Sequence, residues 1–224
     1  MKLKKKTKKA LIFILIVIIL VGGFFIYKEF FAKSPTKVKK VDSIPGYGYN
    51  LKSTHPEEYK KLFNDLKEIL KEEDVNKEAY AKKISQMFIY DFFSLDYKVA
   101  KTDVGGVEFI YPEIEKNFLE NAQSTYYKYL ESNIYGNRNQ DLPRVTKPKV
   151  SNIEQTPFKY TITKDKKDIE QTDPKAYKVD VEWNYTDEEF DDYQKEGTLI
   201  LINDGKKLQI VELSSEEDQK EAND

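Results

Sequence analysis

The sequence predicts an α+β fold: an N-terminal transmembrane helix, then about three helices packed on a curved antiparallel sheet of about four strands. Three observations lead to this prediction. Residues 10–27 are apolar and uncharged, residues 57–130 place apolar side chains three and four positions apart, and after Gly136 apolar and polar residues alternate. Helical periods followed by strand periods are typical of the α+β class.

The apolar run Ala10–Tyr27 contains eighteen residues. A helix rises about 1.5 Å per residue and a bilayer core is about 30 Å thick, so a segment extended to residue 31 is long enough to span it. A cleaved signal peptide is the alternative. Its apolar region is usually about 7–15 residues long and ends in small side chains, whereas Phe24–Tyr27 is bulky. We therefore expect an uncleaved anchor.

The lysines before this run predict its orientation, because positively charged flanks stay in the cytoplasm. The expected membrane-anchoring residues are Lys4, Lys5, Lys6, Lys8, Lys9 and, at the interface, Tyr27. Five more lysines follow between residues 28 and 40, so the asymmetry is modest. We expect a single-pass protein of the cell membrane with the lipid bilayer as a partner. Its N-terminus would be cytoplasmic and its C-terminal domain extracellular.

The chain divides into five predicted parts: a basic tail at 1–9, the anchor at 10–31, a tether at 32–52, an extracytoplasmic α+β cone-like domain at 53–213 and an acidic disordered tail at 214–224. Proline, glycine and lysine without a helical period predict the tether. In an alternative interpretation Ile44–Tyr49 docks on the domain, because tyrosines between glycines are typical of a packed loop. The acidic tail has too few apolar residues to fold.

Three helices are expected within the domain. Thr54–Glu57 has the pattern of a capping box, and the apolar residues from Tyr59 to Leu70 predict the first helix. The second runs from about Asn76 to Leu95 and is apolar around most of its circumference, so it should lie centrally. After the break at Gly105-Gly106, a third helix begins near Pro112. Its inward residues are expected to be Ile114, Phe118, Leu119, Ala122, Tyr126, Tyr129 and Leu130.

The strands are expected after Gly136. Alternating residues predict strands around Phe158–Ile162 and Tyr177–Tyr185, and the second is clearly one-sided. Pro157 predicts a bend or bulge in the first of them. Leu199–Ile202 is apolar on both faces and turns through Asn203-Asp204-Gly205 into a further apolar run, which indicates a hairpin.

Charge and composition exclude several functions. The net charge of −2 hides a basic first forty residues, with eleven lysines and one acid, and a remainder with 26 basic and 38 acidic side chains. A domain this acidic repels a phosphate backbone, so we expect no nucleic-acid partner. The chain has no cysteine, and His55 is its only histidine, so it lacks the side chains that a thiolate site, a zinc site or a histidine-based catalytic triad requires. We expect no metal, no cofactor and no catalytic motif.

Asp91 is the one carboxylate singled out, because it falls on the apolar stripe of the second helix. Burial raises the pKa of a carboxyl group, and such an acid can serve as a general base. The favoured alternative is a structural aspartate bonded to a tyrosine hydroxyl or a lysine. Asp91, Tyr90, Trp183 and Tyr126 are the candidate residues for a ligand pocket. His55, in contrast, is expected to be a solvated cap residue.

The end of the chain reads Gly197, Leu199, Leu201, Asp204-Gly205-Lys206, Leu208 and Ile210. With the aromatic central helix, this order resembles the nuclear-transport-factor-like (cystatin-like) cone fold over about residues 56–213. The membrane-anchored layout looks like the bitopic assembly subunits of bacterial type IV secretion and conjugation channels. The resemblance implies a cone domain held outside the membrane. Fold alone does not fix function.

We therefore expect a non-enzymatic interaction or assembly module of the bacterial cell envelope, with other envelope proteins as partners and self-association as an option. The alternative is an extracellular module that binds a peptide, lipid or glycan in the cone pocket. An enzyme that uses Asp91 ranks third. Assembly predicts an exposed apolar patch, whereas ligand binding predicts an open apolar cavity of several hundred Å³ beside the central helix.

Overall fold

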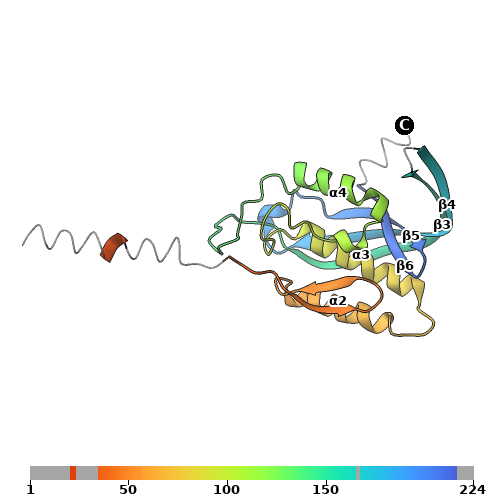
Figure 1. Ribbon diagram of the computed structural model, residues 1–224, viewed down its shortest axis with the longest axis horizontal. Coiled ribbons are helices and arrows are strands. Elements are labelled where there is room, and N and C mark those ends of the chain that lie inside the picture. The colour runs from red at the N-terminus through yellow and green to blue at the C-terminus, as the bar shows by residue number, and fades with distance from the viewer. Residues whose placement is uncertain (1–20, 24–34, 165–166, 216–224) are drawn as a thin grey trace, which may run out of the picture.

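The computed structural model describes residues 21–23, 35–164 and 167–215. This part of the chain is α+β and contains two antiparallel sheets, one of two strands and one of four (Figure 1). The small sheet is a hairpin, and the large one is a meander in the order β3-β4-β5-β6. In chain order the elements are β1 (Lys40–Ile44), β2 (Tyr49–Lys52), α2 (Glu57–Ile69), α3 (Lys77–Phe93), η1 (Val107–Phe109), α4 (Pro112–Ser124), β3 (Val145–Lys164), β4 (Lys167–Tyr185), η2 (Glu188–Phe190), β5 (Glu196–Asp204) and β6 (Lys207–Ser214).

Helix α3 lies at the centre, between α2 and the four-stranded sheet (Figure 1). It begins at Asn76, whose side-chain oxygen accepts a hydrogen bond from the Ala79 amide at 3.0 Å. Eleven of its residues are buried, and Met87 and Phe88 are completely covered. The apolar circumference predicted this central place, because such a helix has no face that prefers water.

The sheet follows the predicted alternation. Along β4 the side chains from Tyr177 to Tyr185 alternate between buried and less buried, and the buried ones face α3. The register of β3 against β4 shifts between Thr156 and Phe158, next to Pro157, as predicted. Gly205 closes the β5–β6 hairpin with a φ of +59°, a conformation that glycine adopts without strain.

The outer face of the sheet carries a second, smaller apolar cluster. Ala176, Ile200 and Ile202 form it, and partly buried aromatic residues from the distal half of β3 pack against it. The β3–β4 hairpin reaches this position because its far end curls over the sheet (Figure 1). The curvature therefore brings the distal part of one edge strand, β3, towards the end of the sheet occupied by the other edge strand, β6.

The hairpin β1–β2 lies within the predicted tether and is part of the folded domain. Gly46 and Gly48 have φ values of +76° and +78°, which shape its turn. Tyr49 is completely buried, and its hydroxyl lies 2.5 Å from that of Tyr80 on α3. Ile44–Tyr49 thus docks on the domain, as the alternative interpretation of this segment held.

The predicted fold class needs two corrections. No helix in the described part of the chain is long and apolar enough to cross a membrane. The longest, α3, has 17 residues and carries charges, whereas a span needs about 20 apolar residues. The second correction is that the helices accompany two sheets and not one.

The predictions that depended on a transmembrane helix are corrected with it. These are the single-pass topology and the membrane location with a cytoplasmic N-terminus. The bilayer as a partner stays a prediction. Of the segment 10–31, only residues 21–23 are described. The lysines at 4, 5, 6, 8 and 9 and Tyr27 lie outside the described residues, as does the acidic tail from residue 216.

Two local predictions are also wrong. Helix α2 has Pro56 at its N-cap without a side-chain hydrogen bond, so the expected capping box does not form. Helix α4 ends at Ser124, earlier than the apolar pattern indicated. The side chain of Tyr129 therefore lies beyond the helix and is 76% exposed instead of facing inward.

Candidate functional site

Asp91 is buried at the centre of a polar cluster. Only 1% of the residue is exposed. Its Oδ1 accepts a hydrogen bond from the Tyr97 hydroxyl at 2.6 Å and forms an ion pair with the Lys98 ammonium, while its Oδ2 accepts from the Gly106 amide at 2.7 Å. Burial opposes ionisation of Asp91, but Lys98, His55 and these hydrogen bonds outweigh burial and hold the pKa of its carboxyl below the usual range.

The two glycines that interrupt the chain let the backbone approach this cluster. A Cβ on Gly105 would lie 2.1 Å from the Asp91 carbonyl oxygen and 2.6 Å from Lys98 Nζ. The Gly105 amide donates to the Tyr127 hydroxyl at 3.1 Å, and that hydroxyl donates to the Phe92 carbonyl at 2.7 Å. Asp91 thus fixes the segment that leads from α3 to α4.

His55 is part of the cluster and is not a solvated cap. It is 3% exposed, its Nδ1 accepts from the Lys52 amide at 3.2 Å, and its ring lies 4.1 Å from the ring of Tyr59. Its Nε2 lies 3.7 Å from Asp91 Oδ1, beyond hydrogen-bonding distance. Burial lowers the pKa of His55 to about 4, so the imidazole is neutral at pH 7. Nothing in its local sequence indicated burial, because its neighbours in the chain are polar.

Glu108, on η1, completes the cluster. Burial and then the charge of Asp91 raise the pKa of its carboxyl to about 7, against the opposite effects of Lys52 and Lys98. The buried Tyr59 hydroxyl faces the charges of Glu108 and Asp91. Lys52 in turn pairs with Asp103 at 3.0 Å, so the cluster holds three acids, two lysines and a neutral histidine in contact with the core.

The other predicted pocket residues are packed in the core and do not meet Asp91 in a cavity. Trp183 Nε1 donates to the Tyr185 hydroxyl at 3.1 Å, and the Trp183 ring lies 4.8 Å from that of Phe93. The Tyr126 hydroxyl donates to the Phe93 carbonyl at 2.9 Å. Tyr90, on α3 itself, is 1% exposed. All three side chains fill space beside α3.

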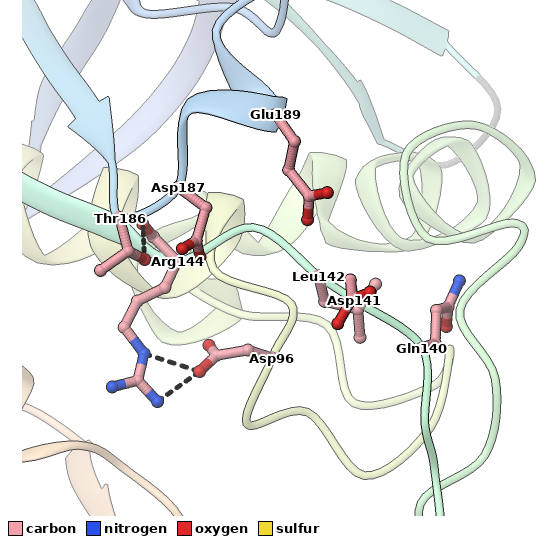
Figure 2. A pocket seen from close by; sticks show the side chains of 8 residues that line it. All are labelled: Asp96, Gln140, Asp141, Leu142, Arg144, Thr186, Asp187 and Glu189. Carbon is pink, nitrogen blue, oxygen red and sulfur yellow. Dashed lines mark hydrogen bonds and ion pairs between the residues drawn. The ribbon is translucent and has the colours of Figure 1, made fainter.

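One hollow on the described surface, of about 670 Å³, is polar. Asp96, Arg144, Asp187, Glu189, Gln140, Asp141, Leu142 and Thr186 line it. Figure 2 shows Arg144 turned towards Asp96: Arg144 Nε donates to Asp96 Oδ2 at 2.6 Å, and Nη2 forms an ion pair with the same oxygen. The described residues contain no group of three or more acids and histidines that could hold a metal ion. Because its one arginine is already paired, this hollow offers only scattered carboxylates on loops.

A second hollow is an apolar groove of about 370 Å³ between α4 and β6. Its floor is formed by Phe88 and Phe92 of α3. One wall follows α4 and its C-terminal end, with Ile114, Asn117, Phe118, Asn121, Ala122 and Thr125. The opposite wall is formed by Ile110 and the β6 residues Ile210, Val211, Glu212 and Leu213. This is an open apolar cavity of several hundred Å³ beside the central helix, the feature expected of a ligand-binding module. The residues predicted for a pocket do not line it.

The groove follows the edge of a strand. Successive side chains of a strand point to opposite faces, so a hollow lined by four consecutive residues, Ile210 to Leu213, lies along the strand's edge. β6 ends the strand order, and its outer edge has one bridge among the described residues, between Ile110 and Ile210. The Tyr111 amide donates there to the Ile210 carbonyl at 2.9 Å. Beyond that bridge the edge opens into the groove.

Helix α4 forms the other wall and is loosely packed. Of its residues only Ala122 is buried, whereas Ile114, Phe118 and Leu119 are half-buried. Periodicity identified these residues as the apolar face of the helix. It could not indicate that the facing element would be a sheet edge, because strand order is not encoded in local pattern.

Comparison with known proteins gives no identification. No family model, no curated protein and no solved structure matches the chain. The resemblance to the cone fold and to secretion-channel subunits therefore stays an expectation.

Proposed function

We propose that this domain is a non-enzymatic interaction module that binds an extended peptide segment of a partner protein along β6. The observation that carries the proposal is the apolar groove between α4 and the edge of β6. An edge strand offers unpaired amide and carbonyl groups, and a peptide can add to them as a further strand. The groove beside the edge then receives alternate side chains of the peptide.

The chemistry of the groove indicates the peptide. The partly exposed ring of Phe118 forms aromatic surface in the wall, above the buried rings of Phe88 and Phe92, and favours aliphatic or aromatic side chains. The amides of Asn117 and Asn121 stand on the rim, where they can bond a backbone. Glu212 on β6 and Glu113 and Glu115 on α4 make the surroundings acidic, while Glu120 on α4 is paired with Lys116. We therefore expect apolar residues that alternate along the peptide, with basic residues at its ends.

A direct test uses a synthetic probe. A fluorescein-labelled peptide of about ten residues, with valine and threonine alternating between terminal lysine pairs, has the expected pattern. Fluorescence anisotropy should report a Kd on the order of 10 μM, and a peptide with proline in place of each valine should not bind, because proline cannot pair in a strand interior. Backbone NMR should place the largest amide shifts at Val211, Glu212 and Leu213.

Variants make the test specific to this edge. Leu213→Lys puts a charge into the groove and should weaken the peptide at least about tenfold. Val38→Lys is the matched control, because Val38 is exposed and lies outside the groove. The proposal is wrong if the peptide does not bind, if Leu213→Lys binds it as tightly as the unmodified protein, or if the shifted amides lie elsewhere. Dimers that the peptide does not dissociate would instead indicate that a second copy occupies the edge.

A further inference from the structure

A third hollow lies next to the apolar groove at the β6 edge. It measures about 240 Å³ and shares Ile114, Val211 and Glu212 with the larger groove. Its far wall is the distal half of β3, with Phe158, Lys159, Tyr160 and Thr161, and Tyr111 closes it beside α4. The two hollows are therefore neighbours along the same stretch of β6, so a peptide that lies along this edge would pass both of them.

Aromatic rings line this third hollow. Tyr111 and Tyr160 meet edge to face, with ring centroids 5.8 Å apart. Phe158 adds a third ring from the same strand as Tyr160. Tyr160 is oriented by its hydroxyl, which donates to Gln171 Oε1 at 2.9 Å. Faces of such rings attract cations as well as apolar groups, because the π system is negative.

The charge at this hollow is predominantly negative. The carboxylate of Glu212, at the junction of the two hollows, has no ion-pair or hydrogen-bond partner among the described residues. Burial raises the pKa of the Tyr111 and Tyr160 hydroxyls, and the charges of nearby Asp204, Asp173 and Glu113 raise it further. The one cation in the wall, Lys159, is engaged by Glu170 at 3.0 Å.

The geometry points to a pocket that binds an arginine side chain of the peptide that we propose for the β6 edge. Aromatic faces receive a guanidinium plane, and a free carboxylate pairs with its N–H groups, so both features of the hollow suit this one side chain. The inference rests on the proposed function for the position of the arginine in a peptide. The chemistry of the pocket can be tested separately from it.

The first experiment needs no peptide. Fluorotyrosine is incorporated into the protein, and the signals of Tyr111 and Tyr160 are assigned with Tyr111→Phe and Tyr160→Phe. N-acetyl-arginine-methylamide should shift both signals, and the citrulline analogue, which has the same shape without the charge, should not. Glu212→Gln should abolish the shifts. Glu72→Gln, which removes an exposed charge far from the pocket in the turn after α2, should leave them intact.

The second experiment joins the pocket to the groove. The lysine-flanked peptide is made with arginine or citrulline at the position that faces Val211 and Glu212, which line both hollows. Arginine should bind about tenfold more tightly, the ratio expected for one charge-assisted hydrogen bond, and Glu212→Gln should remove the difference.

The outcomes separate the two proposals. Equal response to arginine and citrulline in both experiments overturns the arginine pocket while leaving strand addition intact. If the arginine compound shifts the signals of Tyr111 and Tyr160 but the lysine-flanked peptide fails to bind, the pocket is supported and peptide binding in the groove is rejected. No response of the tyrosines to either compound overturns the pocket whatever the peptide does.

Discussion

Helices α3 and α4 both carry an apolar face but have opposite environments. Eleven residues of α3 are buried, whereas Ala122 is the one buried residue of α4. α3 contacts α2 on one side and the sheet on the other, while α4 leaves its apolar face half covered above the β6 edge. The difference separates a stabilising region from a candidate binding surface. The polar cluster around Asp91 stabilises the centre of the domain at α3. Apolar side chains remain partly exposed at its rim, in the groove between α4 and β6.

The largest effect is expected at the centre of this contrast. Asp91→Asn removes the charge that balances Lys98, which then lies buried without a counter-ion. Breaking a buried pair in this way should lower the free energy of unfolding by about 3–5 kcal/mol. Urea denaturation at pH 7 measures it. Asp65→Asn is the matched control, because the Asp65–Lys83 pair is 2.9 Å long and Asp65 is 60% exposed, so its loss should cost less than about 1 kcal/mol.

If Asp91→Asn were neutral or stabilising, the cluster would not hold the centre together. The contrast between the two helices would then rest on apolar packing alone. Lys98→Met tests the same pair from the other side: it should also destabilise the fold, because Asp91 keeps its burial and loses its strongest compensating charge.

A smaller effect should appear as a pH optimum. The Glu108 pKa is raised from 4.5 to about 7, so this group contributes stability that is complete below about pH 4.5 and is lost as the pH rises through 7. The His55 pKa is lowered from 6.5 to about 4, so its contribution is complete above about pH 6.5 and is lost as the pH falls through 4. Stability should therefore be greatest near pH 5–6.

Urea midpoints from pH 4 to 8 test this profile. Glu108→Gln should remove the loss of unfolding free energy on the alkaline side. This loss should be about 2 kcal/mol between pH 5 and 8, less than the full pKa shift implies, because Glu108 is partly exposed and solvent screens its interactions. Glu58→Gln, an exposed acid on α2, is the control and should leave the profile unchanged. An alkaline loss that persists in Glu108→Gln would assign it to another group.

Much of the centre could be predicted from local pattern, whereas its polar cluster could not. The alternation from Tyr177 to Tyr185 fixes which face of β4 is inward, and Asn203–Gly205 marks the hairpin that follows. Asp91 could be recognised as a buried acid with a tyrosine or lysine partner, because it lies on an apolar stripe. The identity of Lys98 and the glycine amide as partners depends on how the loop returns, which periodicity does not encode.

The rim was less predictable still. The groove exists because β6 ends the strand order and α4 stands off from it, and both are properties of the tertiary arrangement. His55 illustrates the same limit, because its polar neighbours indicated solvent while the fold buries it against Tyr59. The apolar run at 10–27 illustrates another, since hydropathy alone led to a membrane location that the described helices do not support.

The finest test of the contrast compares one phenylalanine from each helix. Phe88 on α3 is completely buried and Phe118 on α4 is half-buried, yet their rings lie 6.0 Å apart and both line the groove. Phe88→Ala should destabilise the fold by about 3–5 kcal/mol, the usual cost of a core cavity. Phe118→Ala should cost about 1 kcal/mol, since its ring is only partly removed from water, and should weaken the lysine-flanked peptide about tenfold. Equal destabilisation by the two variants, with peptide affinity unchanged in Phe118→Ala, would show that α4 belongs to the core and that the groove is not a binding surface.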